Sequence, residues 1–291
     1  MKNIRLLTIL LTSLFLWYSC DKVEPPYVEN GNGGELNSDT VRKVLVEDFT
    51  GHTCVNCPQA HKIIEDLQQH YGKQLVAVAI HAGFFAKPKS APYDYDFRTT
   101  EGTALYNLFQ VQATPIGMVN RVKQSDGGYL VNKGALASEV SKQLDSLPQK
   151  PDLYIHLTPS FNSSDSTLSL AAEITFLEAL PSAKYNLCIM VTESDIVKAQ
   201  KNNDPTIGST PDIFDYHHKH VLRGMMTPTL GEEILDGTPG NMQVISKSYS
   251  NFKFGADWVP KNCRVVAFVY YADGPKKYQI IQAQEVEVAT P

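Results

Sequence analysis

The sequence has no cluster of lysine and arginine residues, and its 26 basic side chains are outnumbered by 31 acidic ones. This charge balance argues against nucleic acid as a partner, because binding to phosphates requires a basic surface. No apolar run reaches the length of about 20 residues that a membrane-spanning helix needs. No segment is repeated along the chain. The hydrophobic content of 43% is that of an ordinary globular protein.

The amino terminus carries a mostly apolar run from Leu6 to Trp17, preceded by Lys2 and Arg5. A short apolar run after positive residues is typical of a secretory signal peptide. A serine and Cys20 follow, as in lipoprotein signals, in which the cysteine thiol receives diacylglycerol. We therefore predict a lipoprotein signal peptide over residues 1–19 and a lipid anchor at Cys20. An ordinary signal peptide that ends near an unrelated cysteine is the alternative.

Residues 20–40 are rich in proline, glycine, asparagine and acidic residues and have no apolar period, so we predict a flexible tether. Removal of residues 1–19 takes away two basic side chains and no acidic one, which leaves a net charge of −7. The roughly 250 residues after the tether suit two domains of ordinary size.

The first predicted domain, residues 41–149, alternates between strand and helix patterns. Strands are expected at 42–49, 74–83, 113–120 and 129–132, and helices at 60–71, 105–111 and 133–147. The segment 84–98 has prolines and aromatic residues but no period, and we interpret it as an inserted loop over a site. The pattern predicts an α/β domain.

The second predicted domain, residues 151–291, consists of short strand patterns separated by turns, and its middle, residues 195–240, has little periodicity. This pattern of short strands and turns predicts an all-β, sandwich-like domain. Cys188 and Cys263 lie in two of its predicted strands. Because disulfides persist in exported proteins, these cysteines either form a structural disulfide across the sandwich or remain buried free thiols.

Two further cysteines, Cys54 and Cys57, stand where the first predicted strand is followed by the first predicted helix, within the segment VEDFTGHTCVNCPQAH. The free N–H groups and the dipole of a helix N-terminus stabilise a thiolate, so we expect a lowered pKa for Cys54. Cys54 would then be the nucleophile toward disulfides, and the shielded Cys57 would be the resolving thiol. Pro58 is tolerated in the first helical turn, where its missing N–H costs little.

The order of elements, the CxxC after the first core strand and the Thr-Pro before a later strand make residues 41–149 resemble a thioredoxin fold. The resemblance implies that Asp48, six residues before Cys54, is buried beneath the pair and moves protons for the resolving thiol. It also implies that Pro115 matches the family's cis-proline, which packs beside the pair and shapes the substrate-binding edge. Glu47 would point to the opposite face of the sheet.

The sequence departs from thioredoxin at the residues around the cysteines. Thr53 stands where the family usually has tryptophan, and Val55-Asn56 replaces the usual Gly-Pro between the cysteines. The intervening pair tunes the redox potential in that family, so the direction of electron transfer stays open.

The layout of the whole chain resembles the Omp28 family of outer-membrane lipoproteins from Bacteroidetes-type bacteria. The resemblance rests on the lipoprotein signal, the tether, the unit with GHTCVNCPQAH, and the β-rich half with YHHKHVLRG. It implies a location in the cell envelope, lipid-anchored at the outer membrane, and it implies no particular reaction.

The CxxC also allows functions other than disulfide exchange. Cys54 and Cys57 could bind zinc with His52 and His61, but no second CxxC or paired histidine follows at the spacing of a zinc finger. Pro58 excludes covalent haem, which needs histidine after the second cysteine. A structural disulfide without turnover is a further alternative. A second group of histidines is interpreted as surface or hydrogen-bonded side chains, with metal binding as the alternative: His217, His218 and His220.

We therefore predict a lipid-anchored thiol-disulfide oxidoreductase of the cell envelope, without a cofactor or metal. Its partners would be protein thiols or disulfides and an upstream redox partner, and its only membrane attachment would be the lipid. The alternative is a surface binding or adhesion lipoprotein in which the thioredoxin-like unit is a scaffold. In that case, residues 84–98 and 195–240 would be the recognition surfaces.

Overall fold

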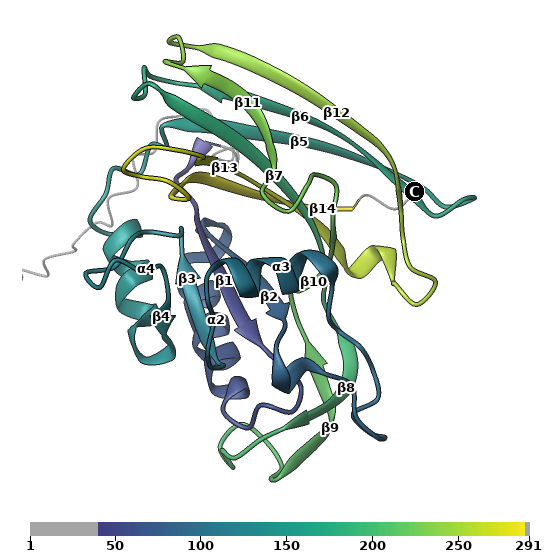
Figure 1. Cartoon of the computed structure of the whole chain (residues 1–291). Helices are drawn as coiled ribbons and strands as arrows, with labels where there is room; N and C mark the ends of the chain where they lie inside the picture. Colours follow the sequence, from purple (N-terminus) through teal and green to yellow (C-terminus); the bar gives the residue numbers. More distant parts are fainter. Residues whose placement is uncertain (1–39, 289–291) are drawn as a thin grey trace, which may run out of the picture. The chain divides into compact units, whose positions relative to one another are not determined.

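The computed structural model describes residues 40–288 (Figure 1). The predicted signal peptide, the lipid anchor Cys20 and the tether up to residue 39 lie outside the described residues. The described chain is mostly β-structure and is built around a mixed sheet. Across residues 40–288, no helix combines the length and apolar character needed to cross a membrane.

The first part of the described chain alternates between strands and helices. Its elements are β1 (Val44–Thr50), α2 (Cys57–Tyr71), β2 (Leu75–His81), α3 (Thr100–Leu108), β3 (Ile116–Val119), β4 (Val131–Asn132) and α4 (Leu136–Leu144). Strand β1 pairs in parallel with β2 and antiparallel with β3. All residues of β1 and β2 are buried, as expected for apolar strands that are covered on both faces.

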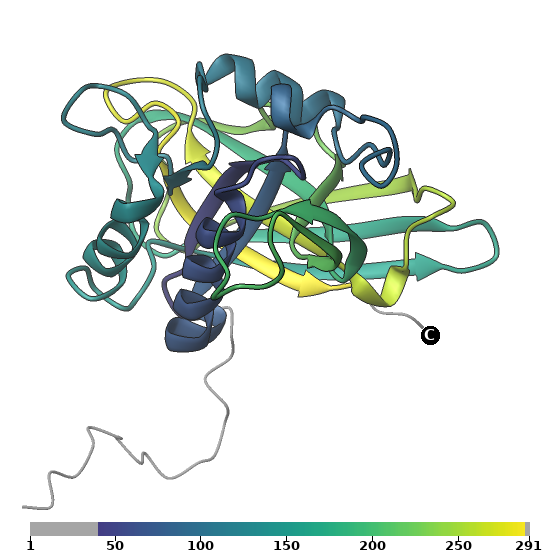
Figure 2. The same ribbon diagram turned by 90° about the horizontal axis from the view of Figure 1, so that it is seen from below.

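The helices cover opposite faces of β1 and β2. Val44 and Val46 pack in one core with residues of α2 and α4, whereas Leu45 and Phe49 pack in another core with Leu105 of α3. This division follows from the alternation of side chains along a strand. Figure 2 shows α3 on one side of these strands and α2 on the other.

The second part of the described chain consists of strands. They are β5 (Leu153–Asn162), β6 (Thr167–Phe176), β7 (Ala183–Glu193), β8 (Ile196–Lys201), β9 (Asp212–His218), β10 (Val221–Met225), β11 (Glu232–Gly237), β12 (Gln243–Lys253), β13 (Cys263–Tyr271) and β14 (Ile280–Glu287). The predicted strands of this half are therefore present. Four more, β8 to β11, lie within the segment 195–240 that had little periodicity, and β12 follows it.

One sheet joins both halves of the chain, in the order β14-β13-β7-β10-β2-β1-β3-β4, with β11 beside β7. Strand β10 makes the junction, since it pairs with β7 on one side and with β2 on the other. Residues 41–149 and 151–291, which were predicted as separate domains, therefore share a sheet. They also share a core, in which Phe268 of β13 and Met190 of β7 pack with Leu45 of β1.

A second sheet, β12-β6-β5, covers the other face of β7 and β13. Alternate residues of β7 divide between the two cores: Leu187 and Ile189 face this second sheet, and Cys188 and Met190 face the core shared with α3. Strands β8 and β9 form a separate two-stranded hairpin. In Figure 1 this hairpin lies at the end of the molecule toward which the arrow of β1 points.

Candidate functional site

Cys54 and Cys57 form a disulfide at the start of α2, with their Cα atoms 5.4 Å apart. Cys57 is the first residue of the helix, three positions earlier than the sequence pattern predicted, and Pro58 occupies its first turn. Cys54 lies in the preceding turn, where its N–H donates to the Gly51 carbonyl at 3.0 Å. The structure therefore places the pair at the junction of strand and helix that the sequence indicated.

Both cysteines are buried, with exposed fractions of 2% for Cys54 and 0% for Cys57. The sequence interpretation expected only Cys57 to be shielded, so the burial of Cys54 is a correction. The side chains between them, Val55 and Asn56, are exposed. The physical reason for the difference is a segment from the second half of the chain that lies against this turn.

That segment, which we call the cap, comprises residues 200–203 at the end of β8. The buried amide group of Gln200 donates to the Cys54 carbonyl at 3.0 Å and to the Gly51 carbonyl at 3.4 Å. The N–H groups of Lys201 and Asn203 donate to the carbonyls of His52 and Val55 at 2.9 and 3.1 Å. The cap thus binds the backbone on both sides of Cys54. Sequence reasoning missed it because residues 195–240 show no period that would place them near the cysteines.

Asp48 lies on β1 with its side chain only 2% exposed. Its Oδ2 atom is 3.3 Å from His61 Nε2, and neither carboxylate oxygen accepts a hydrogen bond from the described residues. His61 is four residues after Cys57, so the two side chains share one face of α2. Asp48 therefore lies against the helix face that begins with Cys57.

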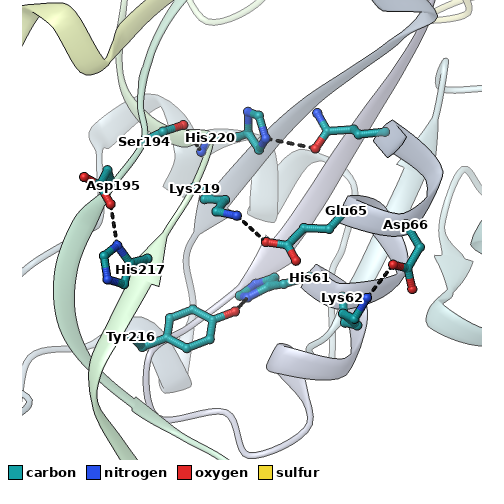
Figure 3. A network of polar contacts seen from close by, with 11 residues as sticks. His61, Lys62, Glu65, Asp66, Ser194, Asp195, Tyr216, His217, Lys219 and His220 are labelled. Carbon is teal, nitrogen blue, oxygen red and sulfur yellow. Dashed lines mark hydrogen bonds and ion pairs between the residues drawn. The ribbon is translucent and has the colours of Figure 1, made fainter. Parts of the chain in front are cut away.

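The ring of His61 is held by two hydroxyl groups. Its Nε2 is 2.9 Å from Thr50 Oγ1, and its Nδ1 is 2.7 Å from the hydroxyl of Tyr216 on β9 (Figure 3). A cavity of about 30 Å³ borders Asp48, His61 and Tyr216. Its volume suits about one water molecule. A water molecule there could supply the hydrogen bond that Asp48 lacks.

Pro115 follows a cis peptide bond and precedes β3. Because Ile116 pairs with Phe49, Pro115 lies beside the end of β1, close to the turn that leads to Cys54. Thr114 and Pro115 are both half-buried. The structure therefore brings together Asp48, Cys54, Cys57 and Pro115 around the end of β1, while Cys20 lies outside the described residues.

Glu47 faces the opposite side of the sheet from Asp48, as expected from strand alternation. Both its carboxylate oxygens accept hydrogen bonds at 2.6 Å from the guanidinium of Arg121, which is fully buried. The guanidinium also lies 4.9 Å from the ring of Phe268 and 5.1 Å from that of Phe109. This buried ion pair was not predicted. A lone arginine after a strand gives no sequence signal for a partner 74 residues away.

The two histidines near the pair differ in exposure. His52 is buried, and its Nε2 lies 3.2 Å from the Tyr93 carbonyl. His61 is partly exposed. Burial, the largest cause, lowers the pKa of His52. In the disulfide form, Cys54 and Cys57 have no thiolate to offer to zinc.

The three histidines of the HHxH motif diverge. His217 is exposed and pairs with Asp195, His218 is buried, and His220 Nε2 lies 3.1 Å from the Gln68 amide oxygen. Burial lowers the pKa of His220 to about 4. Among the described residues, no group of three or more histidine, cysteine or acidic side chains is arranged to hold a metal ion.

Cys188 and Cys263 are both buried free thiols, so of the two alternatives that the sequence left open, the structure has the free thiols and no disulfide between them. The register of β7 and β13 gives the reason: Cys188 is opposite Phe268, and Cys263 is opposite Glu193. Five residues along a strand span about 16 Å, far beyond the reach of a disulfide. The two thiols also face different cores.

Fold and site together define a mostly β protein with a mixed sheet and a covered disulfide at the start of a helix. The sequence matches the model of the family described as "Outer membrane protein Omp28" over residues 102–290, which is more than half of the chain. The chain therefore belongs to the Omp28 family, as its layout predicted. Membership of this family places it in the cell envelope, lipid-anchored at the outer membrane.

Solved structures resemble this chain at low sequence identity. HBP35 of Porphyromonas gingivalis is similar with a TM-score of 0.63 and 16% identity, covering 86% of this chain and 76% of that chain. A domain of the outer membrane lipoprotein Omp28 from Porphyromonas gingivalis has a TM-score of 0.31 and 16% identity, covering 47% of this chain and 88% of that one. At this identity the likeness to HBP35 concerns the fold alone. No curated protein matches the sequence.

Proposed function

We propose that this protein is a lipid-anchored thiol-disulfide oxidoreductase whose residues 41–149 form a thioredoxin-like unit. The observation that carries the proposal is the Cys54–Cys57 disulfide at the start of α2, the helix whose next turn holds His61 against the buried carboxylate of Asp48. A thiol at a helix N-terminus has a stabilised thiolate, which is the attacking species in disulfide exchange. The clients would be protein disulfides, and an upstream redox partner would return the electrons.

In the reducing direction, the Cys54 thiolate attacks one sulfur of a client disulfide and expels the other as a thiolate. Asp48 takes the proton of the Cys57 thiol, and the Cys57 thiolate attacks the Cys54 sulfur. The bond between Cys54 and the client breaks, and the second client sulfur leaves as a thiolate. The protein is then oxidised by two electrons and the client is reduced by two. Protons from solvent convert the client thiolates to thiols.

Replacement of the cysteines tests this function. We expect Cys54→Ser to abolish reduction of insulin disulfides and Cys57→Ser to accumulate mixed disulfides, which non-reducing gels detect. Cys263→Ala is the matched control, because it removes a buried thiol at another place in the sheet. An activity that survives in Cys54→Ser, or its absence in the wild type with every donor and acceptor, would contradict the proposal.

The direction of transfer follows from the equilibrium reduction potential of the pair. A value near about −270 mV would indicate a reductant, and one near about −120 mV an oxidant. A pair that is reduced only when the chain unfolds would point to a structural disulfide instead.

The burial of Cys54 favours a second candidate, a binding or adhesion lipoprotein in which the redox geometry is only a scaffold. With 2% of the residue exposed, the cap must move before a client sulfur can reach Cys54. If the double variant Cys54→Ser/Cys57→Ser keeps the binding and cellular phenotype of the wild type, this second candidate is the better one.

Removal of the Gln200 amide tests whether the cap controls access. Gln200→Ala deletes hydrogen bonds to Gly51 and Cys54, each with a net contribution of about 0.5–1.5 kcal/mol. Local opening is then easier, so we expect dithiothreitol to reduce the disulfide about tenfold faster. Gln112→Ala, which changes an exposed glutamine, is the control. Equal rates for Gln200→Ala and the wild type would show that the cap does not limit access.

A further inference from the structure

One face of α2 is joined to the chain segment 216–220 by three side-chain contacts. His61 Nδ1 lies 2.7 Å from the Tyr216 hydroxyl, Lys219 Nζ donates to Glu65 at 2.6 Å, and His220 Nε2 lies 3.1 Å from the Gln68 amide oxygen (Figure 3). His61, Glu65 and Gln68 continue the helix face that starts with Cys57. The segment 216–220 therefore orients the His61 ring through the Tyr216 hydroxyl and holds the next turns of α2 through Lys219 and His220.

The fixed ring connects a buried acid with the surface. Its Nε2 faces the Asp48 carboxylate at 3.3 Å, while the side chain of His61 is 17% exposed and that of Asp48 only 2%. Asp48 accepts no hydrogen bond from any described residue. The titratable side chain that contacts its carboxylate is His61. A proton on Asp48 can reach the solvent through this ring or through a water molecule in the adjoining cavity.

We propose that His61 is the positioning residue through which Asp48 exchanges its proton with solvent during disulfide exchange. The inference rests on the proposed oxidoreductase function and assigns a role that the resemblance to thioredoxin does not provide. In the tautomer that carries its proton on Nδ1 and donates it to the Tyr216 oxygen, the lone pair of Nε2 lies between Thr50 Oγ1 at 2.9 Å and Asp48 Oδ2 at 3.3 Å.

The proton balance is complete within this arrangement. Asp48 receives the proton of the Cys57 thiol when Cys57 attacks the mixed disulfide, and passes that proton to His61 Nε2. The resulting imidazolium releases one proton to solvent, while solvent supplies a proton to the departing client thiolate. No electron passes through His61 and no proton stays on the protein.

The surrounding groups are suited to this role. Tyr216 stays a neutral hydroxyl, because burial, together with the charges of Glu65 and Asp48, raises its pKa. It therefore orients the ring without itself losing a proton. The other titratable groups around the cavity that adjoins His61 are Glu65 with its partner Lys219, His217 and His220. His81 and His218 stay neutral because burial lowers their pKa well below the ordinary value.

The test is the resolving step, measured by stopped flow as the release of glutathione from a mixed disulfide with Cys54. We expect His61→Gln to slow this step about a hundredfold near neutral pH and to change its pH profile, a loss typical of positioned acid–base groups. Alkylation of Cys54 by iodoacetamide should be unchanged. Added imidazole should restore part of the rate in His61→Gln, which a purely structural role would not allow.

Two further variants complete the design. Tyr216→Phe keeps the histidine but removes its orienting hydroxyl, so we expect a smaller loss of rate with the folded structure retained. His70→Gln changes an exposed histidine on the same helix and should match the wild type. A wild-type pH profile in His61→Gln overturns the role of His61 alone. A wild type that cannot resolve the mixed disulfide overturns the oxidoreductase function itself.

Discussion

Replacing Arg121 with methionine is expected to lower the free energy of unfolding by about 3–5 kcal/mol, the usual cost of leaving one member of a buried ion pair alone. Glu47 would then be a carboxylate with 1% exposure and without the two hydrogen bonds at 2.6 Å that it accepts from Arg121. The rings of Phe109 and Phe268 would lose the guanidinium that lies against them. Equilibrium unfolding in urea measures the change.

A double variant separates the cost of an isolated charge from the value of the pair. Glu47→Met/Arg121→Met removes both charges, and we expect it to recover most of the lost stability, because apolar side chains of similar size fit a core of this kind. Lys150→Met is the surface control. Its exposed pair with Glu178 should contribute less than about 1 kcal/mol. A loss below this value in Arg121→Met would show that Glu47 finds another partner.

The local features of the candidate site could be predicted because they depend on neighbours in sequence. A buried strand followed by CxxC and a helical period placed Cys54 and Cys57 at a helix start, and strand alternation separated Asp48 from Glu47. The Thr114-Pro115 pair before β3 was likewise visible as a short motif. In each case the spacing along the chain determines the position in space.

The remaining features depend on pairing between distant segments. Gln200 reaches Cys54 across 146 residues, and nothing in the sequence around Gln200 indicates that contact. Cys188 and Cys263 were placed in the correct strands, but only the register shows that they lie five positions apart. The shared sheet depends on β10, a five-residue strand too short to give a period of its own. Such pairings are decided by which apolar faces need cover, which a single sequence does not specify.

The buried histidines beside the site have a consequence for stability as a function of pH. His81 is 3% exposed, its ring is 4.5 Å from that of Phe97, and both ring nitrogens lack a hydrogen-bond partner among the described residues. Burial, the largest cause, lowers its pKa well below 6.5, and the neighbouring His218 shifts in the same direction for the same reason. Both histidines are therefore neutral in the folded protein under mildly acidic conditions.

The sign of the effect follows from proton binding. Well above about pH 6.5 these histidines are neutral in both states, so they add no pH dependence there. As the pH falls below that value, the unfolded chain binds protons that folded His81 and His218 do not bind. Each contributes a slope of up to about 1.4 kcal/mol per pH unit, so the free energy of unfolding falls by up to about 2.7 kcal/mol per unit until their folded pKa values are reached.

His81→Phe should remove one of these two protons from the balance. Phenylalanine keeps an aromatic ring against Phe97 and has no nitrogen to desolvate, so we expect a more stable protein at about pH 5 and a shallower slope by about one proton. Urea unfolding between about pH 7 and about pH 5 measures both quantities. His70→Phe, at an exposed site on α2, is the matched control and should keep the wild-type slope. If His81→Phe also keeps that slope, folded His81 binds a proton as readily as the unfolded chain, and buried water or a shift of Phe97 must accommodate its charge.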